Sequence, residues 1–174
     1  MRDIEWMTTP EARPNHEIVL REPKPGDLGW IVARHAELYA EEYGWAGNFE
    51  GICAQIVADF AAKYDPNCER CWIAEMDGRN VGCVFLVKDA GTVARLRLLL
   101  VDPAARGRGL GQRLTGECVG FARQSGYTAI TLWTHSVLTA ARHIYEKAGF
   151  RLTASESKKN FGKNVVSEYW DLAL

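Results

Sequence analysis

The sequence predicts an α+β domain in which a mixed, mostly antiparallel central sheet is flanked by about four helices. Short segments rich in β-branched and aromatic residues alternate with segments whose apolar residues recur at helical spacing. A strand–helix–strand crossover lies near the middle of the chain, and such a crossover makes its two strands parallel. Hairpin patterns lie on either side of it, so we expect the sheet to be antiparallel at both ends.

The 174 residues fit one domain that is long enough to bury a core. Residues 1–15 show no periodic pattern and are expected to form an arm, which leaves residues 16–174 as the domain. Ile18–Arg21 is expected to be the first strand. Two helical stripes follow, at residues 27–40 and 49–64, and Asn48 is expected to cap the second helix.

A three-stranded meander comes next, with Asp77-Gly78 as a two-residue hairpin turn. Its last strand carries Arg95 and Arg97, which predict one polar face. The expected strands are residues 71–75, 81–87 and 95–101.

The second half of the chain supplies the crossover and a closing hairpin. The crossover helix begins at a glycine-rich loop and stops at Gly126, and the last helix ends at Gly149. A polar, basic segment, residues 158–164, is expected to connect the strands of the closing hairpin. The expected elements are a strand at 127–134, a helix at 138–148, and hairpin strands at 150–152 and 165–174.

Composition excludes several classes of function. The net charge is -1, so no global positive field favours nucleic acid or an anionic membrane. No apolar run reaches the ~20 residues of a membrane-spanning helix, and the first residues do not look like a secretion signal. Together with the cysteines described next, these features lead us to expect a cytoplasmic protein without nucleic-acid or membrane partners.

The five cysteines are odd in number and widely spread, which suits a reducing compartment. Cys68 and Cys71 form a C-x-x-C pair, but one pair cannot complete a four-ligand zinc site. No second pair at metal-site spacing is present, so we expect no metal and interpret these two cysteines as structural.

The glycine-rich loop is the strongest chemical signal in the sequence. Gly107, Gly109 and Gly111 allow close approach of a ligand to the backbone where a helix begins. The free N–H groups and the dipole of a helix start favour a pyrophosphate. Arg106 and Arg108 add positive charge with a geometry that suits phosphate.

Two common nucleotide motifs do not fit this loop. It lacks the Gly-Lys-Ser/Thr of a Walker A loop. The dinucleotide pattern G-x-G-x-x-G also fails, because its last position falls on Gln112 or Leu114. A tight strand–helix turn without a ligand remains the alternative interpretation.

The segment Leu98–Gly111, with its apolar strand, Asp102-Pro103 turn and glycine loop, resembles the central motif of GNAT acetyltransferases. A second segment, Ala141–Phe150, is similar to the last helix of that family, with its Tyr and terminal Gly-Phe. The resemblance covers residues 18–174. Four shorter segments resemble, more narrowly, GNAT domains fused to MarR-type regulators, although no helix-turn-helix remains here: residues 72–75, 96–99, 132–134 and 161–162.

The resemblance implies a GNAT fold in which strands 96–101 and 127–134 splay apart around acetyl-CoA. It also implies that acetyl-CoA is the cosubstrate of an N-acetyltransferase, and that an acceptor amine attacks the thioester directly. Tyr145 would donate a proton to the leaving thiolate. The cofactor-binding residues implied are Leu99, Leu100, Val101, Arg106, Gly107, Arg108, Gly109, Leu110 and Gly111.

Several roles stay open. Leu138 occupies a position where many family members carry an Asn that contacts pantetheine. The general base is His135, Glu75, Glu168 or water, with an exposed structural histidine as the plainer interpretation of His135. The acceptor is a small-molecule or peptide amine, and residues 39–45 are expected near its pocket.

Two further alternatives concern the whole molecule. The chain could act as a non-catalytic sensor that holds acyl-CoA without turnover, because Leu138 and the unassigned base weaken the case for an enzyme. A homodimer is also left open.

Overall fold

The computed structural model describes residues 16–174, so the arm expected at residues 1–15 lies outside the described residues. The described chain forms one seven-stranded sheet in the order β1-β2-β3-β4-β5-β7-β6. Its strands are β1 (Ile18–Arg21), β2 (Arg70–Met76), β3 (Arg79–Ala90), β4 (Val93–Val101), β5 (Ala129–His135), β6 (Arg151–Asn160) and β7 (Lys163–Ala173). Its α-helices are α1 (Asp27–Tyr43), α2 (Phe49–Lys63), α3 (Leu110–Gln124) and α4 (Thr139–Ala148), and a 3-10 turn, η1, spans Pro103–Ala105.

The strand pairing confirms the predicted mixed sheet. Among the described strands only β4 and β5 pair in parallel, joined by the α3 crossover, and every other pair is antiparallel. β7 lies between β5 and β6, so β6 forms one edge of the sheet and β1 the other.

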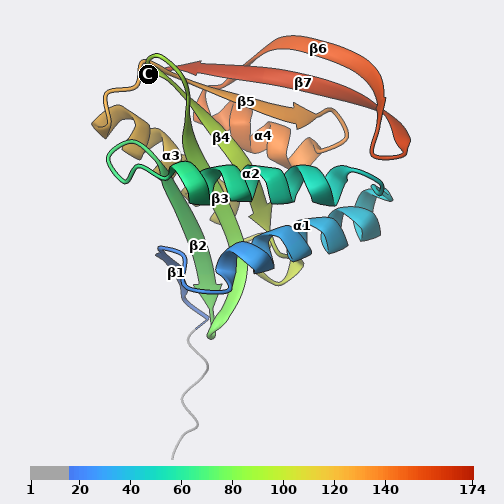
Figure 1. Cartoon of the computed structure of the whole chain (residues 1–174), viewed down its shortest axis with the longest axis horizontal. Helices are drawn as coiled ribbons and strands as arrows, with labels where there is room; N and C mark the ends of the chain where they lie inside the picture. Colours follow the sequence, from blue (N-terminus) through green and yellow to red (C-terminus); the bar gives the residue numbers. More distant parts are fainter. Residues whose placement is uncertain (1–15) are drawn as a thin grey trace, which may run out of the picture.

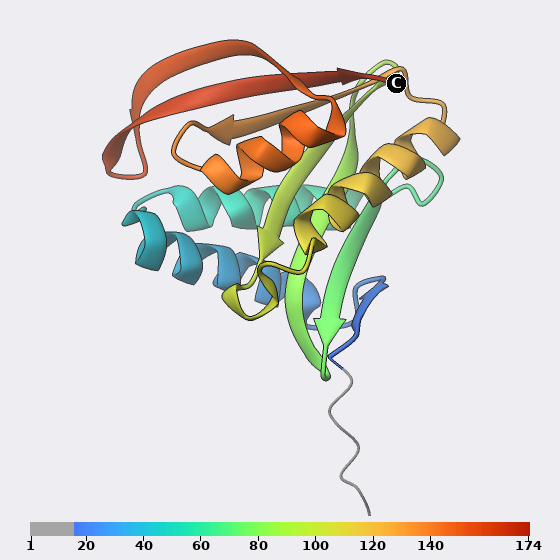
Figure 2. The same ribbon diagram turned by 180° about the vertical axis from the view of Figure 1, so that it is seen from behind.

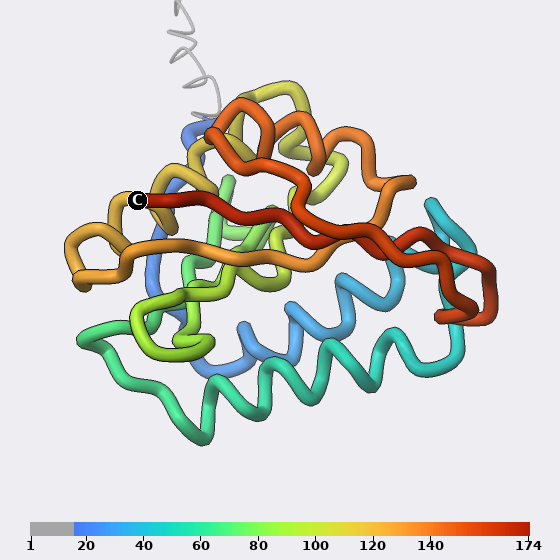
Figure 3. Tube along the Cα trace, turned by 90° about the horizontal axis from the view of Figure 1, so that it is seen from above, coloured from blue at the N-terminus to red at the C-terminus, as the bar shows by residue number. Residues whose placement is uncertain are grey.

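The four helices cover both faces of the sheet. α1 and α2 lie side by side across one face, and α3 and α4 cover the other (Figures 1 and 2). Seen from above, the sheet runs between these two layers (Figure 3). The two larger cores lie between α1, α2 and the sheet, around Ile31 and Phe85, and beneath α3, around Leu96 and Leu114. A smaller cluster forms around Trp45 and Phe161.

A bulge in β4 separates the two central strands. The register between β3 and β4 slips by one residue between Cys83/Leu100 and Phe85/Arg97, and Leu98 adopts φ 51. The extra residue reverses which side chains face each helix layer beyond it. Pairing between β4 and β5 ends at Leu96–Leu132, so the following halves of the two strands diverge. The predicted splaying is therefore confirmed, with the bulge at Leu98 next to the point where pairing stops.

Two local expectations differ from the structure in detail. Asn48 is the N-cap residue of α2 as expected, but it makes no side-chain capping bond, and its Nδ2 donates instead to Asn160 Oδ1 at 3.2 Å. The polar segment 158–164 is not a long connection, because β6 and β7 continue to a turn at Phe161-Gly162. β6 is a mostly solvent-exposed edge strand, which explains why polar residues form it.

Within residues 16–174, no helix has the length and apolar character needed to cross a membrane.

Candidate functional site

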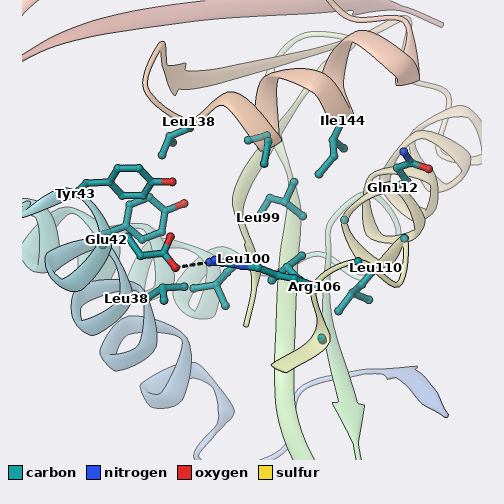
Figure 4. Close-up of a pocket in the computed structure, with 18 residues that line it drawn as sticks. Leu38, Glu42, Tyr43, Leu99, Leu100, Arg106, Leu110, Gln112, Leu138 and Ile144 are labelled. Atoms are coloured by element: carbon teal, nitrogen blue, oxygen red, sulfur yellow. Dashed lines mark hydrogen bonds and ion pairs between the residues drawn. The ribbon is translucent and has the colours of Figure 1, made fainter. Parts of the chain in front are cut away.

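A cavity of about 350 Å³ lies where β4 has parted from β5, and we call it the large cavity. It is bounded by α1, by the glycine loop with the start of α3, and by α4 (Figure 4). Every predicted cofactor-binding residue except Arg108 lines it: Leu99, Leu100, Val101, Arg106, Gly107, Gly109, Leu110 and Gly111.

The glycine loop has the backbone that its sequence predicted. Gly107 and Gly109 adopt φ 74 and φ 72, a backbone region that residues other than glycine rarely adopt. A Cβ built on either residue meets nothing within 4 Å, so both border open space. Gly109 ends the loop as the N-cap of α3 and has no side chain to cap the helix. The first N–H groups of α3 thus point out of the helix end, where a phosphate would fit.

Gly111 has a different role from its neighbours. A Cβ there would lie 2.5 Å from Ile144 Cδ1, so its lack of a side chain allows close packing of α3 against α4. Arg108 points away from the large cavity and donates to the carbonyl oxygen of His16 at 3.2 Å. Of the two loop arginines, the structure therefore brings only Arg106 into the cavity.

Helix α1 holds the loop from the opposite side. Arg106 Nη2 lies 2.6 Å from Glu42 Oε1, and both residues line the large cavity (Figure 4). Arg34 Nε donates to Asp102 Oδ2 at 2.8 Å, while Asp102 Oδ1 accepts from the Ala104 N–H at 3.0 Å. These contacts fix both ends of the turn that leads from β4 into the loop.

A second, smaller cavity of about 100 Å³ opens beside the first, and we call it the aromatic cavity. Its wall combines aromatic side chains from α1, the α1–α2 connection, α2, β5 and the β6–β7 turn: Tyr39, Trp45, Phe49, Trp133 and Phe161. Four residues line both cavities, namely Tyr39, Leu99, Leu138 and Ala141. The two cavities therefore adjoin along these four residues.

Tyr145 lies on α4 in the wall of the aromatic cavity. Its side chain is buried, its ring packs against Phe150, and no hydrogen bond to its hydroxyl occurs within residues 16–174. Burial raises the pKa of Tyr145 above its usual value, so the hydroxyl keeps its proton at neutral pH. The geometry leaves this hydroxyl available as a donor to a ligand.

His135 is buried at the end of β5, which contradicts the expectation of an exposed histidine. Burial, together with the positive charge of Lys158, lowers the pKa of His135 to about 4. His35 lines the same cavity, and burial lowers its pKa to about 4 as well. Nδ1 of His35 donates to the Ile31 carbonyl oxygen at 2.8 Å. The Nε2 atoms of both histidines are buried without a partner.

The other two candidate bases line neither cavity. Glu75 Oε2 accepts from Arg21 Nε at 2.6 Å, beside the start of α1. Glu168 lies 3.0 Å from Arg142 Nε and accepts from Trp170 Nε1. The structure thus assigns both carboxylates to structural ion pairs.

The two C-x-x-C cysteines are free thiols remote from the cavities. Cys71 is buried in β2, and Cys68 Sγ donates to Asp65 Oδ2 at 3.5 Å. No cluster that could hold a metal ion occurs among residues 16–174.

Several cavity residues have no individual role assigned from the sequence, although Phe161 lies in one of the segments that resemble GNAT domains and Glu42 lies in the stretch 39–45. Phe161 adopts φ 52 in a turn and is fully buried, although the segment around it is polar. Arg97 was interpreted only as part of a polar strand face. The pairing of Glu42 with Arg106 joins residues 64 positions apart, and no local pattern signals it.

The comparisons with known proteins agree with this architecture. Residues 2–150 match the model of the acetyltransferase (GNAT) family. The chain belongs to that family, whose members use acetyl-CoA.

Individual relatives match only parts of this chain, at modest sequence identity. A Xenopus tropicalis protein named "Probable N-acetyltransferase camello" is 31% identical over 70% of this chain and 58% of its own length. N-acetylaspartate synthetase of Danio rerio is 37% identical over 55% of this chain and 34% of its own length. The chain thus spans less than two thirds of either relative. A Salmonella typhimurium acetyltransferase structure with acetyl-CoA shares the fold, at a TM-score of 0.73, with 17% identity and coverage of 90% and 93%.

Proposed function

We propose that this chain is an N-acetyltransferase that binds acetyl-CoA in the large cavity and transfers its acetyl group to a primary amine. The amine occupies the aromatic cavity and attacks the thioester carbonyl directly. The C–N bond forms as the C–S bond breaks, the amine loses a proton, and CoA leaves as a thiolate that takes one up.

The observation that carries this proposal is the shared wall of the two cavities. Leu99 and Leu138 lie between the cofactor side and the acceptor side. Beyond Leu96 the β5-facing edge of β4 has no strand partner among the described residues, so its backbone groups are available to a pantetheine arm. Backbone N–H groups near Leu99 and Val101 would stabilise the negative charge that develops on the carbonyl oxygen.

The glycine loop supplies the pyrophosphate site in this proposal. The open space beside Gly107 and Gly109 and the start of α3 suit an anion. Arg106 is the loop arginine positioned to contribute charge there. Arg108 instead donates to the carbonyl oxygen of His16, just before β1.

Tyr145 acts as the general acid, because its hydroxyl is protonated and lines the acceptor cavity beside the shared wall. For the amine's proton, the candidate acceptors in the wall of the aromatic cavity are the neutral imidazoles of His135 and His35, or a water held by them. Glu75 and Glu168 do not take this role, because ion pairs hold them outside both cavities.

The finer attributes of the chain are also part of the proposal. We place residues 16–174 as one catalytic domain that resembles GNAT domains fused to MarR-type regulators and acts in the cytoplasm. Dimerisation is left open. Relatives of this chain have names as different as N-acetylaspartate synthetase and mycothiol acetyltransferase, so they do not define the acceptor.

An assay of thiol release with acetyl-CoA and a panel of primary amines tests this function. The proposal expects amine-dependent release of CoA. Acetyl-CoA binding with no release across the panel would favour the alternative, a sensor that holds acyl-CoA without turnover.

A further inference from the structure

We infer that the acceptor amine carries a carboxylate, and that Arg97 with the indole N–H of Trp133 binds it in the aromatic cavity. This inference rests on the proposed function and adds the substrate class.

Arg97 is a cation without a direct hydrogen-bond or ion-pair partner among the described residues. It lines the aromatic cavity from β4, just before the bulge, and makes no hydrogen bond or ion pair within residues 16–174. Its neighbour Arg95 differs, since Arg95 Nη2 lies 2.7 Å from Asp89 Oδ1. Arg97 is only partly exposed. Asp59 and Asp89 act on its charge from a distance without forming an ion pair, so its buried N–H groups lack a direct acceptor unless a ligand supplies one.

A second unpaired donor lies in the same cavity wall. Trp133 Nε1 is buried and has no hydrogen-bond partner. Arg95 pairs with Thr131 in the parallel ladder, so Arg97 and Trp133 each follow that pair by two residues and extend toward the same face. An indole N–H can only donate, and a guanidinium can only donate. The ligand group that satisfies both is an acceptor, and a carboxylate does so with charge.

The other charges around the cavity agree with an anionic ligand. No carboxylate lines the aromatic cavity among the described residues. Lys158 Nζ lies 5.6 Å from the centre of the Trp133 ring and adds positive charge nearby, although Glu156 Oε2 lies 3.8 Å from it. Both cavity histidines have pKa values of about 4, so they are neutral and offer no competing cation at neutral pH. The aromatic wall of Trp45, Phe49 and Phe161 suits an apolar side chain on the same acceptor.

The test compares each acid with its own amide. Phenylalanine and phenylalaninamide, and methionine and methioninamide, serve as acceptors in the thiol-release assay with wild type, Arg97→Gln and Arg97→Lys. The wild type is expected to use the acids at least ~10-fold better in kcat/KM, and Arg97→Gln to lower kcat/KM for the acids about 100-fold with little effect on the amides. Arg97→Lys should retain part of the kcat/KM for the acids that Arg97→Gln loses. Arg151→Gln, on the exposed edge strand, is the matched control. It should change kcat/KM for neither the acids nor the amides.

A binding measurement separates this inference from the proposed function. Calorimetry with 3-phenylpropionate and 3-phenylpropionamide in the presence of CoA needs no turnover. Binding of the acid alone, lost in Arg97→Gln, supports the inference even if no amine is acetylated. Equal binding or equal use of acid and amide by the wild type overturns it, whether or not Arg97→Gln folds and whether or not acetyl transfer occurs.

Discussion

Glu42 of α1 and Arg106 of the glycine loop form an ion pair of 2.6 Å whose two side chains line the large cavity. A bound pyrophosphate would compete with Glu42 for the Arg106 guanidinium. Arg106→Gln should therefore weaken acetyl-CoA binding about 10-fold, and Glu42→Gln should leave it unchanged or strengthen it up to about threefold. Calorimetric titration of both variants with acetyl-CoA checks that only Arg106→Gln loses affinity. Equal losses in the two variants would mean that the pair only holds the loop in shape.

Gly109 offers a test of the pyrophosphate site that controls for strain. Its φ of 72 strains any side chain, but Asn and Asp tolerate this region and are nearly the same size. Gly109→Asp places a negative charge at the start of α3, and Gly109→Asn does not. We expect the two variants to unfold at similar temperatures, whereas acetyl-CoA should bind Gly109→Asp at least ~10-fold more weakly. Equal affinities of the two variants for acetyl-CoA would mean that the loop is a turn that binds no pyrophosphate.

Tyr145 and Tyr127 form a matched pair of buried tyrosines. Tyr145→Phe removes a hydroxyl that bonds nothing within residues 16–174, so the free energy of unfolding should change by less than ~0.5 kcal/mol. Its kcat should fall by ~10²–10⁴-fold with acetyl-CoA affinity retained. Tyr127 donates to the Cys68 carbonyl oxygen at 2.9 Å, so Tyr127→Phe should cost about 1 kcal/mol and spare kcat. A loss of stability without a loss of kcat in Tyr145→Phe would mean that Tyr145 is a core residue with no part in catalysis.

The two cavity histidines predict a pH dependence of stability. Their pKa values of about 4 lie below the usual histidine value of about 6.5, so the unfolded chain binds protons more readily than the folded chain. The free energy of unfolding should therefore decrease as pH falls from 6.5 to 4, by about 2 kcal/mol or more for the pair. Urea unfolding across this range checks it. His135→Gln should flatten the dependence, and the same change at exposed His143 should not.

Much of the fold was predictable because local patterns decide it. Helical spacing and glycine stops placed the four helices, and the chain order of strand, helix and strand required the parallel β4–β5 pair. Gly149 ends α4 with φ 96, as its position predicted. The glycine loop was predictable for the same reason, since its conformation depends on residues adjacent in sequence.

The acceptor side was less predictable because it depends on contacts between distant segments. The bulge occurs at Leu98, and no glycine or proline marks it. Phe161 enters the aromatic cavity from a turn between two polar segments. Whether Arg97 meets solvent, a carboxylate or a cavity depends on α2 and β5 packing around it, which hydrophobic periodicity does not describe.

Thermal unfolding of the chain across a range of acetyl-CoA concentrations tests the central claim most directly. Binding to the folded state at ~100 times Kd adds ~2.7 kcal/mol. For a chain of this length that should raise the melting temperature by roughly 5–10 °C. The increase should continue with the logarithm of the acetyl-CoA concentration and should shrink in Gly109→Asp. A melting temperature that stays constant up to millimolar acetyl-CoA would contradict the assignment of the large cavity and the acetyltransferase function built on it.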